Sequence, residues 1–192
     1  MIADDGEILA KGPQVFPGYW NNADATAEVF TDDGWFCTGD VGEIDGDGFL
    51  RITGRKKDLI VTAAGKNVAP APLEDRIRAH PLVSQALVVG EGRPYIAALV
   101  TLDADAVADW ATAHGHPGTT TADLLGDAAL HAEIQRAIED ANASVSHAEA
   151  IKRFTVLPRD LLLEADELTP TLKVRRARVI AAHAEEIERL YA

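Results

Sequence analysis

The sequence predicts an α+β fold in two parts: a short β-rich segment, then a larger part with a small, mainly antiparallel sheet flanked by helices. Up to about residue 56, short apolar runs alternate with Gly and Asp, as in strands joined by tight turns. After residue 57, strand-like runs alternate with segments whose apolar residues recur at helical spacing. We therefore expect a β-rich part over residues 1–56 and a compact α+β part over residues 57–192.

The first part is expected to contain three strands and one short helix. Asn22 is suited to cap a helix that runs through Ala27 to Phe30. The expected strands are residues 6–10, 35–44 and 49–53. The last two flank Asp-Gly-Asp-Gly at 45–48, whose residues favour a hairpin turn. A calcium loop starting there would need an acidic ligand where Lys56 stands, so we prefer the turn.

The second part alternates strands and helices. The expected strands are residues 59–62, 85–90, 95–102 and 151–157, and the expected helices are 72–79, 104–113, about 130–141 and a final helix from about residue 173. Residues 91–94 would close a hairpin between the two central strands. Thr169 or Thr171 can cap the final helix, with Pro170 well placed at its start.

Composition limits the kind of partner. A formal net charge of −13 argues against nucleic acid, because phosphate backbones are bound through clustered positive charge. The apolar runs are strand-length, far short of a transmembrane span, and the N-terminus lacks the pattern of a signal peptide. We expect a cytoplasmic protein, with peripheral membrane association left open. Cys37 stands alone, and the six histidines lack metal-ligand spacing, so no metal site is expected.

Two motifs contain residues suited to bind a nucleotide or a slender ligand. Residues 35–40 read Trp-Phe-Cys-Thr-Gly-Asp, and the carboxylate of Asp40 can accept hydrogen bonds from two adjacent hydroxyls. Residues 54–70 read GRKKDLIVTAAGKNVAP. Within them, Gly65 would allow the backbone to approach a ligand closely. A basic turn leading into a strand is the alternative for Arg55 to Lys57, because charge runs usually form solvated faces.

A third motif, residues 168–176, reads LTPTLKVRR and places Lys173 before further arginines. Cations in the first turn of a helix oppose its dipole, at a cost of roughly a few tenths of a kcal/mol each, so a bound phosphate would relieve them. A solvated basic face is the alternative. The preceding acidic residues can oppose this basic turn. They are Asp160, Glu164, Asp166 and Glu167.

Taken in order, the three motifs resemble those of adenylate-forming enzymes, the superfamily of acyl-CoA synthetases, luciferases and peptide-synthetase adenylation domains. The residues of the second and third motifs resemble those of the long-chain fatty acyl-CoA synthetases. The GEI and GYW segments at residues 6–20 extend the resemblance over essentially the whole chain. It implies that residues 1–56 end the large adenylation domain and that residues 57–192 form a mobile C-terminal lid.

The resemblance also implies roles for the motif residues. Asp40 would hold the ATP ribose, and Arg55 would contact ribose or phosphate. Lys57 would be the hinge about which the lid turns. Lys173 would be the catalytic lysine that stabilises charge during adenylation.

The loop that contains Gly65, Lys66 and Asn67 would face CoA. By the same resemblance, the intact enzyme would join a long-chain fatty acid to CoA through acyl-AMP, with ATP and CoA as substrates and Mg²⁺ on the phosphates. The Mg²⁺ ligands, the family's phosphate-wrapping loop and its acyl pocket have no counterpart in this sequence. We therefore expect a part of a longer enzyme, inactive without its N-terminal portion.

Two alternatives remain open. One is a separate nucleotide-binding, CoA-binding or interaction module without catalysis. The other is an adenylation domain that serves a carrier protein. The LTPTLK sequence at residues 168–173 argues against this second alternative.

Overall fold

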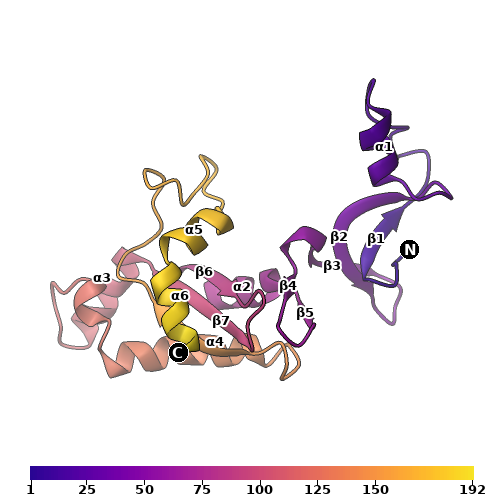
Figure 1. Cartoon of the computed structure of the whole chain (residues 1–192). Coiled ribbons are helices and arrows are strands. Elements are labelled where there is room, and N and C mark those ends of the chain that lie inside the picture. The colour runs from indigo at the N-terminus through magenta and orange to yellow at the C-terminus, as the bar shows by residue number, and fades with distance from the viewer. The chain divides into compact units, whose positions relative to one another are not determined.

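The computed structural model describes all 192 residues, which form two compact units, Met1–Leu59 and Ile60–Ala192 (Figure 1). The predicted α+β class is confirmed: each unit combines a small sheet with helices. None of the helices combines the length and the apolar character that a membrane crossing requires.

The first unit is built on an antiparallel sheet in the order β1-β2-β3. Its strands are β1 (Glu7–Ala10), β2 (Phe36–Ile44) and β3 (Leu50–Arg55), followed by the short 3₁₀ helix η1 (Lys56–Asp58). The predicted helix is present as α1 (Ala23–Val29), and the Asn22 side chain caps it by accepting the N–H of Ala25 at 3.1 Å.

The predicted hairpin between β2 and β3 is confirmed. The Asp45 carboxylate accepts the backbone N–H groups of Asp47 at 3.0 Å and Phe49 at 2.9 Å. Gly48 has φ +88°, a left-handed conformation that glycine adopts without strain. The turn residues therefore close the hairpin with their own side chains and backbone.

The second unit has a three-stranded sheet in the order β6-β7-β8 and a separate two-stranded hairpin. Strands β6 (Val83–Val89) and β7 (Ile96–Leu102) are antiparallel, whereas β8 (Ile151–Val156) pairs in parallel with β7. The hairpin joins β4 (Ile60–Val61) to β5 (Asn67–Val68). The helical elements are α2 (Pro70–Arg78), α3 (Ala104–Ala113), η2 (Ala122–Leu124), α4 (Ala128–Asn142), α5 (Arg176–Ala182) and α6 (Ala184–Tyr191).

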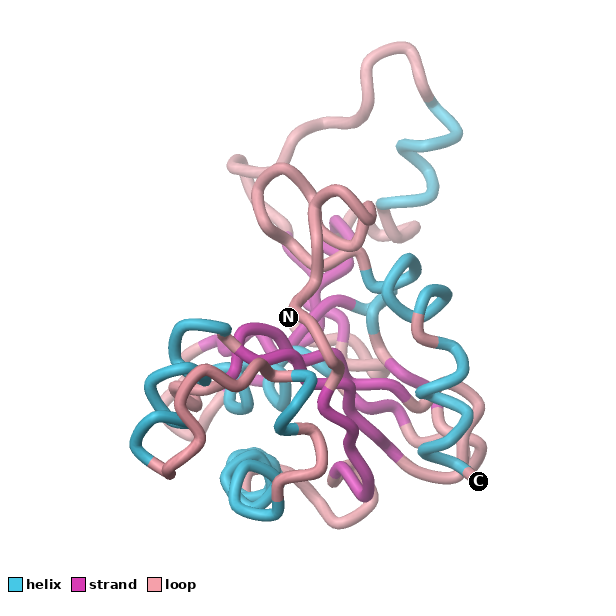
Figure 2. Tube along the Cα trace, turned by 90° about the vertical axis from the view of Figure 1, so that its left-hand side faces the viewer, coloured by secondary structure: helices cyan, strands magenta, loops and turns pink.

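Strand β7 is buried along its whole length, and its side chains alternate between two apolar clusters. Ala98 and Val100 belong to the cluster that includes buried residues of α2, α3 and α4. Ala97 and Leu99 belong to the cluster that includes residues of α5 and α6. Helices therefore cover both faces of the sheet, and Figure 2 shows them on either side of the strands.

The predicted start of the final helix was wrong. Lys173 lies in a loop, α5 begins at Arg176, and the helix is interrupted at His183 before α6. An isolated antiparallel bridge between Leu168 and Val174 turns the chain back on itself, so neither Thr169 nor Thr171 caps a helix. The threonine side chains hydrogen-bond within this loop instead.

The fold predicts a large effect of truncation at the interface between α4 and the sheet. Ile134 is fully buried in the first cluster, so Ile134→Ala removes packed atoms and leaves a cavity. We expect it to lower the free energy of unfolding by about 2–5 kcal/mol, measured by urea titration followed by helical circular dichroism. Leu163→Ala is the control, because Leu163 is 46% exposed. A similar loss in both variants would contradict this packing.

Candidate functional site

Asp40 and Arg55 lie opposite each other on β2 and β3 and form an ion pair. Their Cα atoms are register partners, and Arg55 Nε lies 2.7 Å from Asp40 Oδ1. The Arg55 side chain is more than half exposed, whereas Asp40 is mostly covered. The two residues predicted to bind nucleotide are therefore adjacent, with a carboxylate and a guanidinium on one edge of the hairpin.

The part of β2 that carries Asp40 is held by a buried acid that the sequence analysis missed. Glu7 is buried, and its carboxylate accepts the N–H of Gly39 at 2.9 Å and Lys56 Nζ at 2.7 Å. Lys56 also pairs with Asp5 at 2.6 Å. The carboxylates of Asp5 and Glu7 raise the pKa of the Lys56 ammonium, and Asp5 has the larger effect. Gly39 has φ +72°, which explains the glycine between Thr38 and Asp40.

The loop that contains Gly65 connects β4 to β5 and closes on itself. The Thr62 backbone N–H donates to the Lys66 carbonyl at 3.0 Å, the Lys66 N–H donates to Thr62 Oγ1 at 3.2 Å, and the Gly65 N–H donates to the Thr62 carbonyl. Gly65 has φ +76°, and a Cβ there would meet no heavy atom within 4 Å. Glycine is thus required by the backbone conformation, and the space beside it is open.

The other predicted residues of this region are exposed. Lys66 Nζ lies 3.3 Å from Glu149, whose pKa is lowered mainly by the hydroxyl of Ser146, with Lys66 contributing. Asn67 pairs with Val61 in the hairpin ladder and exposes its side chain. Lys57 is exposed in η1 and makes no ion pair.

Lys173 lies in a tight exposed loop. The Thr169 N–H donates to the Lys173 carbonyl at 2.8 Å, and Thr169 Oγ1 accepts the Lys173 N–H at 3.0 Å. Leu172 has φ +59° and a side chain that is 67% exposed. The loop is therefore held by its backbone, and the Lys173 ammonium is exposed without an ion-pair partner.

The arginines of the third motif lie at the start of α5, as expected, but acidic side chains pair with them, and Lys173 precedes the helix. Arg175 Nη1 and Arg178 Nε lie 3.2 and 2.9 Å from the Asp166 carboxylate, so these arginines are paired. Arg176 pairs with Glu74 and donates to the carbonyl of Val88 at 2.6 Å. Of the four cations, only Lys173 is left without an acidic partner.

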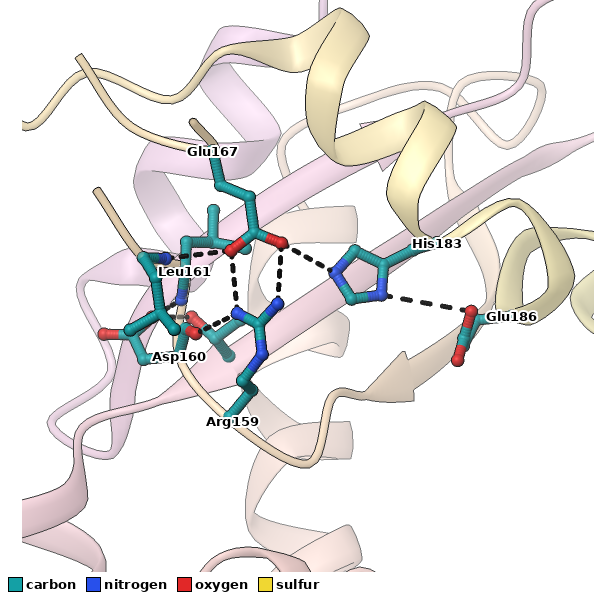
Figure 3. Close-up of polar contacts among 8 residues, drawn as sticks. Arg159, Asp160, Leu161, Glu167, His183 and Glu186 are labelled. Atoms are coloured by element: carbon teal, nitrogen blue, oxygen red, sulfur yellow. Dashed lines mark hydrogen bonds and ion pairs between the residues drawn. The ribbon is translucent and has the colours of Figure 1, made fainter. Parts of the chain in front are cut away.

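Behind this loop, Glu167 is the centre of a buried polar network, shown in Figure 3. Its carboxylate accepts two N–H groups of Arg159, at 2.7 and 2.9 Å, and the N–H of Leu162 at 2.9 Å. Arg159, followed by the Leu162 amide, lowers the pKa of this carboxyl despite its burial. His183 Nε2 lies 3.4 Å from Glu167.

The expected opposition between acidic and basic segments is thus borne out for Asp166, but Glu167 has a different partner. Sequence reasoning could not separate these neighbours, because only the fold shows which acid is buried.

The predicted residues form three groups. Asp40 and Arg55 are paired in the first unit; Gly65, Lys66 and Asn67 share one hairpin; and Lys173 lies in another loop of the second unit. No hydrogen bond or ion pair joins the last two groups. The chain contains no cluster of three or more His, Cys, Asp or Glu side chains suited to a metal ion.

Residues 57–192 match the family model described as the AMP-binding enzyme C-terminal domain. The chain belongs to this family of adenylate-forming enzymes, as the motifs had indicated. It is 55% identical over 191 residues to the long-chain-fatty-acid–CoA ligase FadD15 of Mycobacterium tuberculosis, which covers 99% of this chain and 32% of that protein. The chain therefore spans about a third of the length of this curated relative.

Solved structures of adenylation domains share the fold. The adenylation domain of a carboxylate reductase from Mycobacterium chelonae matches 97% of this chain and 27% of that chain, with 29% identity and a TM-score of 0.72. The corresponding domain from Segniliparus rugosus, solved with AMP and a co-purified carboxylic acid, has 28% identity and a TM-score of 0.70 over 97% of this chain and 28% of that chain.

The Glu167 network predicts a specific response to acid. Because the folded-state pKa of Glu167 lies below its ordinary value of 4.5, its contribution to stability is present above that pH and is lost as the pH falls through the folded pKa. Arg159 and His183 both face this carboxylate. We expect Glu167→Gln to be less stable than the parent near neutral pH, with a difference that narrows below about pH 4.5.

Urea unfolding of both proteins at several pH values measures this difference. A difference in the free energy of unfolding between parent and variant that stays constant down to about pH 3 would contradict a lowered pKa of Glu167. Glu185→Gln, which alters an exposed carboxylate of α6, is the control and should show little change at any pH.

Proposed function

We propose that this chain is the C-terminal part of a long-chain fatty acid–CoA ligase, with Lys173 as its catalytic lysine. The observation that carries the proposal is the unpaired, exposed ammonium of Lys173, which lies just before three arginines that are all paired with acids. The fatty-acid substrate class is supported by the relative named above, a long-chain-fatty-acid–CoA ligase. ATP is supported by the family and by a related domain solved with AMP.

In the first half-reaction, a fatty carboxylate oxygen attacks the α-phosphorus of ATP, and the bond to the β-phosphate oxygen breaks to release pyrophosphate. Lys173 stabilises the negative charge shared by the carboxylate and the α-phosphate oxygens. Asp40 accepts hydrogen bonds from the ribose hydroxyls, and Arg55 contributes a positive charge beside it. The product is acyl-AMP.

In the second half-reaction, the CoA sulfur, having lost its proton, attacks the acyl carbonyl, and the bond to AMP breaks. The domain division is part of the proposal: residues 57–192 act as a lid that turns about Lys57 between the two steps. This turn withdraws Lys173 and brings Gly65, Lys66 and Asn67 towards CoA. The open space beside Gly65 suits the passage of a narrow chain.

Mg²⁺ supplies charge neutralisation on the phosphates in this class of reaction. The chain has no suitable cluster of metal-binding side chains, so we assign no step and no residue here to the ion. The remaining portion of the enzyme supplies the acyl pocket and the phosphate-wrapping loop, and the chain alone is inactive in this proposal.

The proposal predicts the effect of Lys173→Ala in a reconstituted enzyme. This chain replaces the matching C-terminal portion of FadD15, to which it is 55% identical. We expect Lys173→Ala to lower ATP–pyrophosphate exchange with a long-chain fatty acid by about 10²–10³-fold, the usual loss when a charge-stabilising group is removed. The thioester-forming step, started from preformed acyl-AMP, should change little.

The exposed lysine variant Lys152→Ala is the matched control and should retain exchange. Exchange that persists in Lys173→Ala would overturn the assignment of this residue. If the parent graft folds but shows no exchange, the module without catalysis becomes the better interpretation of the chain.

The hinge assignment predicts that Lys57→Pro impairs the thioester step and spares adenylation, the opposite of Lys173→Ala. Proline fixes φ near −65°, and the second residue of the 3₁₀ turn at Lys56–Asp58 can lack an N–H without losing a helical hydrogen bond. We expect adenylation to survive and the thioester step to fall at least about tenfold, because the hinge cannot change its dihedral angles. Lys57→Ala should affect neither step strongly, and equal loss of both steps in Lys57→Pro would contradict a hinge.

A further inference from the structure

The loop that carries Lys173 is joined to the rest of its unit by the apolar packing of Leu168 and Val174 and by the hydrogen bonds of residue 167. The Glu167 carbonyl accepts the N–H of Arg175 at 2.8 Å, which closes the base of the loop beyond the Leu168–Val174 bridge. The Glu167 N–H donates to the carbonyl of Leu162 at 3.1 Å. The backbone on either side of Lys173 therefore converges on one residue.

The side chain of Glu167 fixes that residue in the core. It is 1% exposed, and it accepts two N–H groups of Arg159 (Figure 3). It also accepts the backbone N–H of Leu162. A two-pronged Arg–carboxylate contact restrains both distance and orientation. Arg159 follows β8 by three residues, so the network connects the loop to the segment that leaves the central sheet.

The neighbouring acid makes a weaker attachment. Asp166 pairs with Arg175 and Arg178, but the side chains of all three are 43–67% exposed. Exposed ion pairs hold their partners loosely, because water competes for both charges. Glu167 is almost fully buried, so its bidentate contact with Arg159 is the firmer of these two polar attachments, and it adds to the apolar packing of Leu168 and Val174.

We propose that Glu167 and Arg159 are positioning residues for Lys173, and that the contact of Arg159 with the buried Glu167 carboxylate sets the reach of the Lys173 ammonium during adenylation. The inference rests on the proposed role of Lys173. It follows from the order of contacts: Arg159 holds Glu167, and the Glu167 carbonyl holds Arg175 at the far end of the loop. Within the loop, the Thr169 hydroxyl fixes the Lys173 backbone, and no side chain pairs with the Lys173 ammonium. A displacement of about 1 Å at a reacting group can lower a rate by about 10²-fold.

The kinetic test uses Glu167→Gln, Arg159→Gln and the double variant in the grafted enzyme. We expect each single variant to lower kcat for adenylation at least about tenfold, with little change in KM for ATP. The thioester step from preformed acyl-AMP should stay within about twofold, because Lys173 does not act in it. The double variant should be no worse than the worse single variant, since either change breaks the same pair.

Two further variants separate positioning from general damage. Arg159→Lys keeps the charge and one hydrogen bond, so it should recover part of the activity lost in Arg159→Gln. Glu185→Gln, the same change at an exposed carboxylate of α6, should behave as the parent. Equal losses in both half-reactions would overturn the proposal, as would full adenylation activity in Glu167→Gln.

A measurement on the 192-residue chain does not depend on activity. Hydrogen exchange should speed up at the amides of Lys173 and Arg175 in Glu167→Gln, while the amides of β7 stay protected. Unchanged exchange at both amides would overturn the positioning role even if Lys173→Ala abolishes adenylation. If Lys173→Ala instead leaves adenylation intact, the proposed function fails, and the exchange result still reports how the loop is held.

Discussion

The central strand of the second unit is apolar on both faces, and this constraint organises everything around it. A strand without a polar face needs cover on each side. Helices α2, α3 and α4 cover one face of β7, so the chain after β8 must return across the other as α5 and α6. The loop that contains Lys173 belongs to this returning segment. Its position is therefore a consequence of how the second face of the sheet is covered.

In both units a buried carboxylate supports the backbone that carries a charged candidate site residue. In the first unit, Glu7 accepts the N–H of Gly39 and so supports the part of β2 that contains Asp40. In the second, Glu167 supports the loop that presents Lys173. A buried carboxylate is costly unless hydrogen bonds and a positive charge compensate it, and each of these has both. Such a fully satisfied acid gives a fixed point that an exposed ion pair cannot give.

The pairing of the arginines explains why Lys173 differs from its neighbours. Arg175 and Arg178 share Asp166, and Arg176 reaches Glu74 on α2. The Arg176 pair ties α5 to α2, and the Asp166 pairs neutralise the other two arginines. Lys173, on the far side of the Leu168–Val174 bridge, is the one that remains available to a ligand.

The sequence alone indicated most of the longer elements, the β2–β3 and β6–β7 hairpins, the Asn22 cap and the family, because these depend on local spacing, turn residues and short motifs. It did not indicate the short β4–β5 hairpin. The register that pairs Asp40 with Arg55 and the parallel placement of β8 depend on strands meeting in space. Likewise, Asp166 and Glu167 look alike in sequence, and only the folded chain makes one exposed and the other buried. The sequence also placed Lys173 at a helix start, because its threonines and proline suit a cap. Tertiary structure decided otherwise, since the bridge between Leu168 and Val174 and the hydrogen bonds of Glu167 hold those residues in a loop.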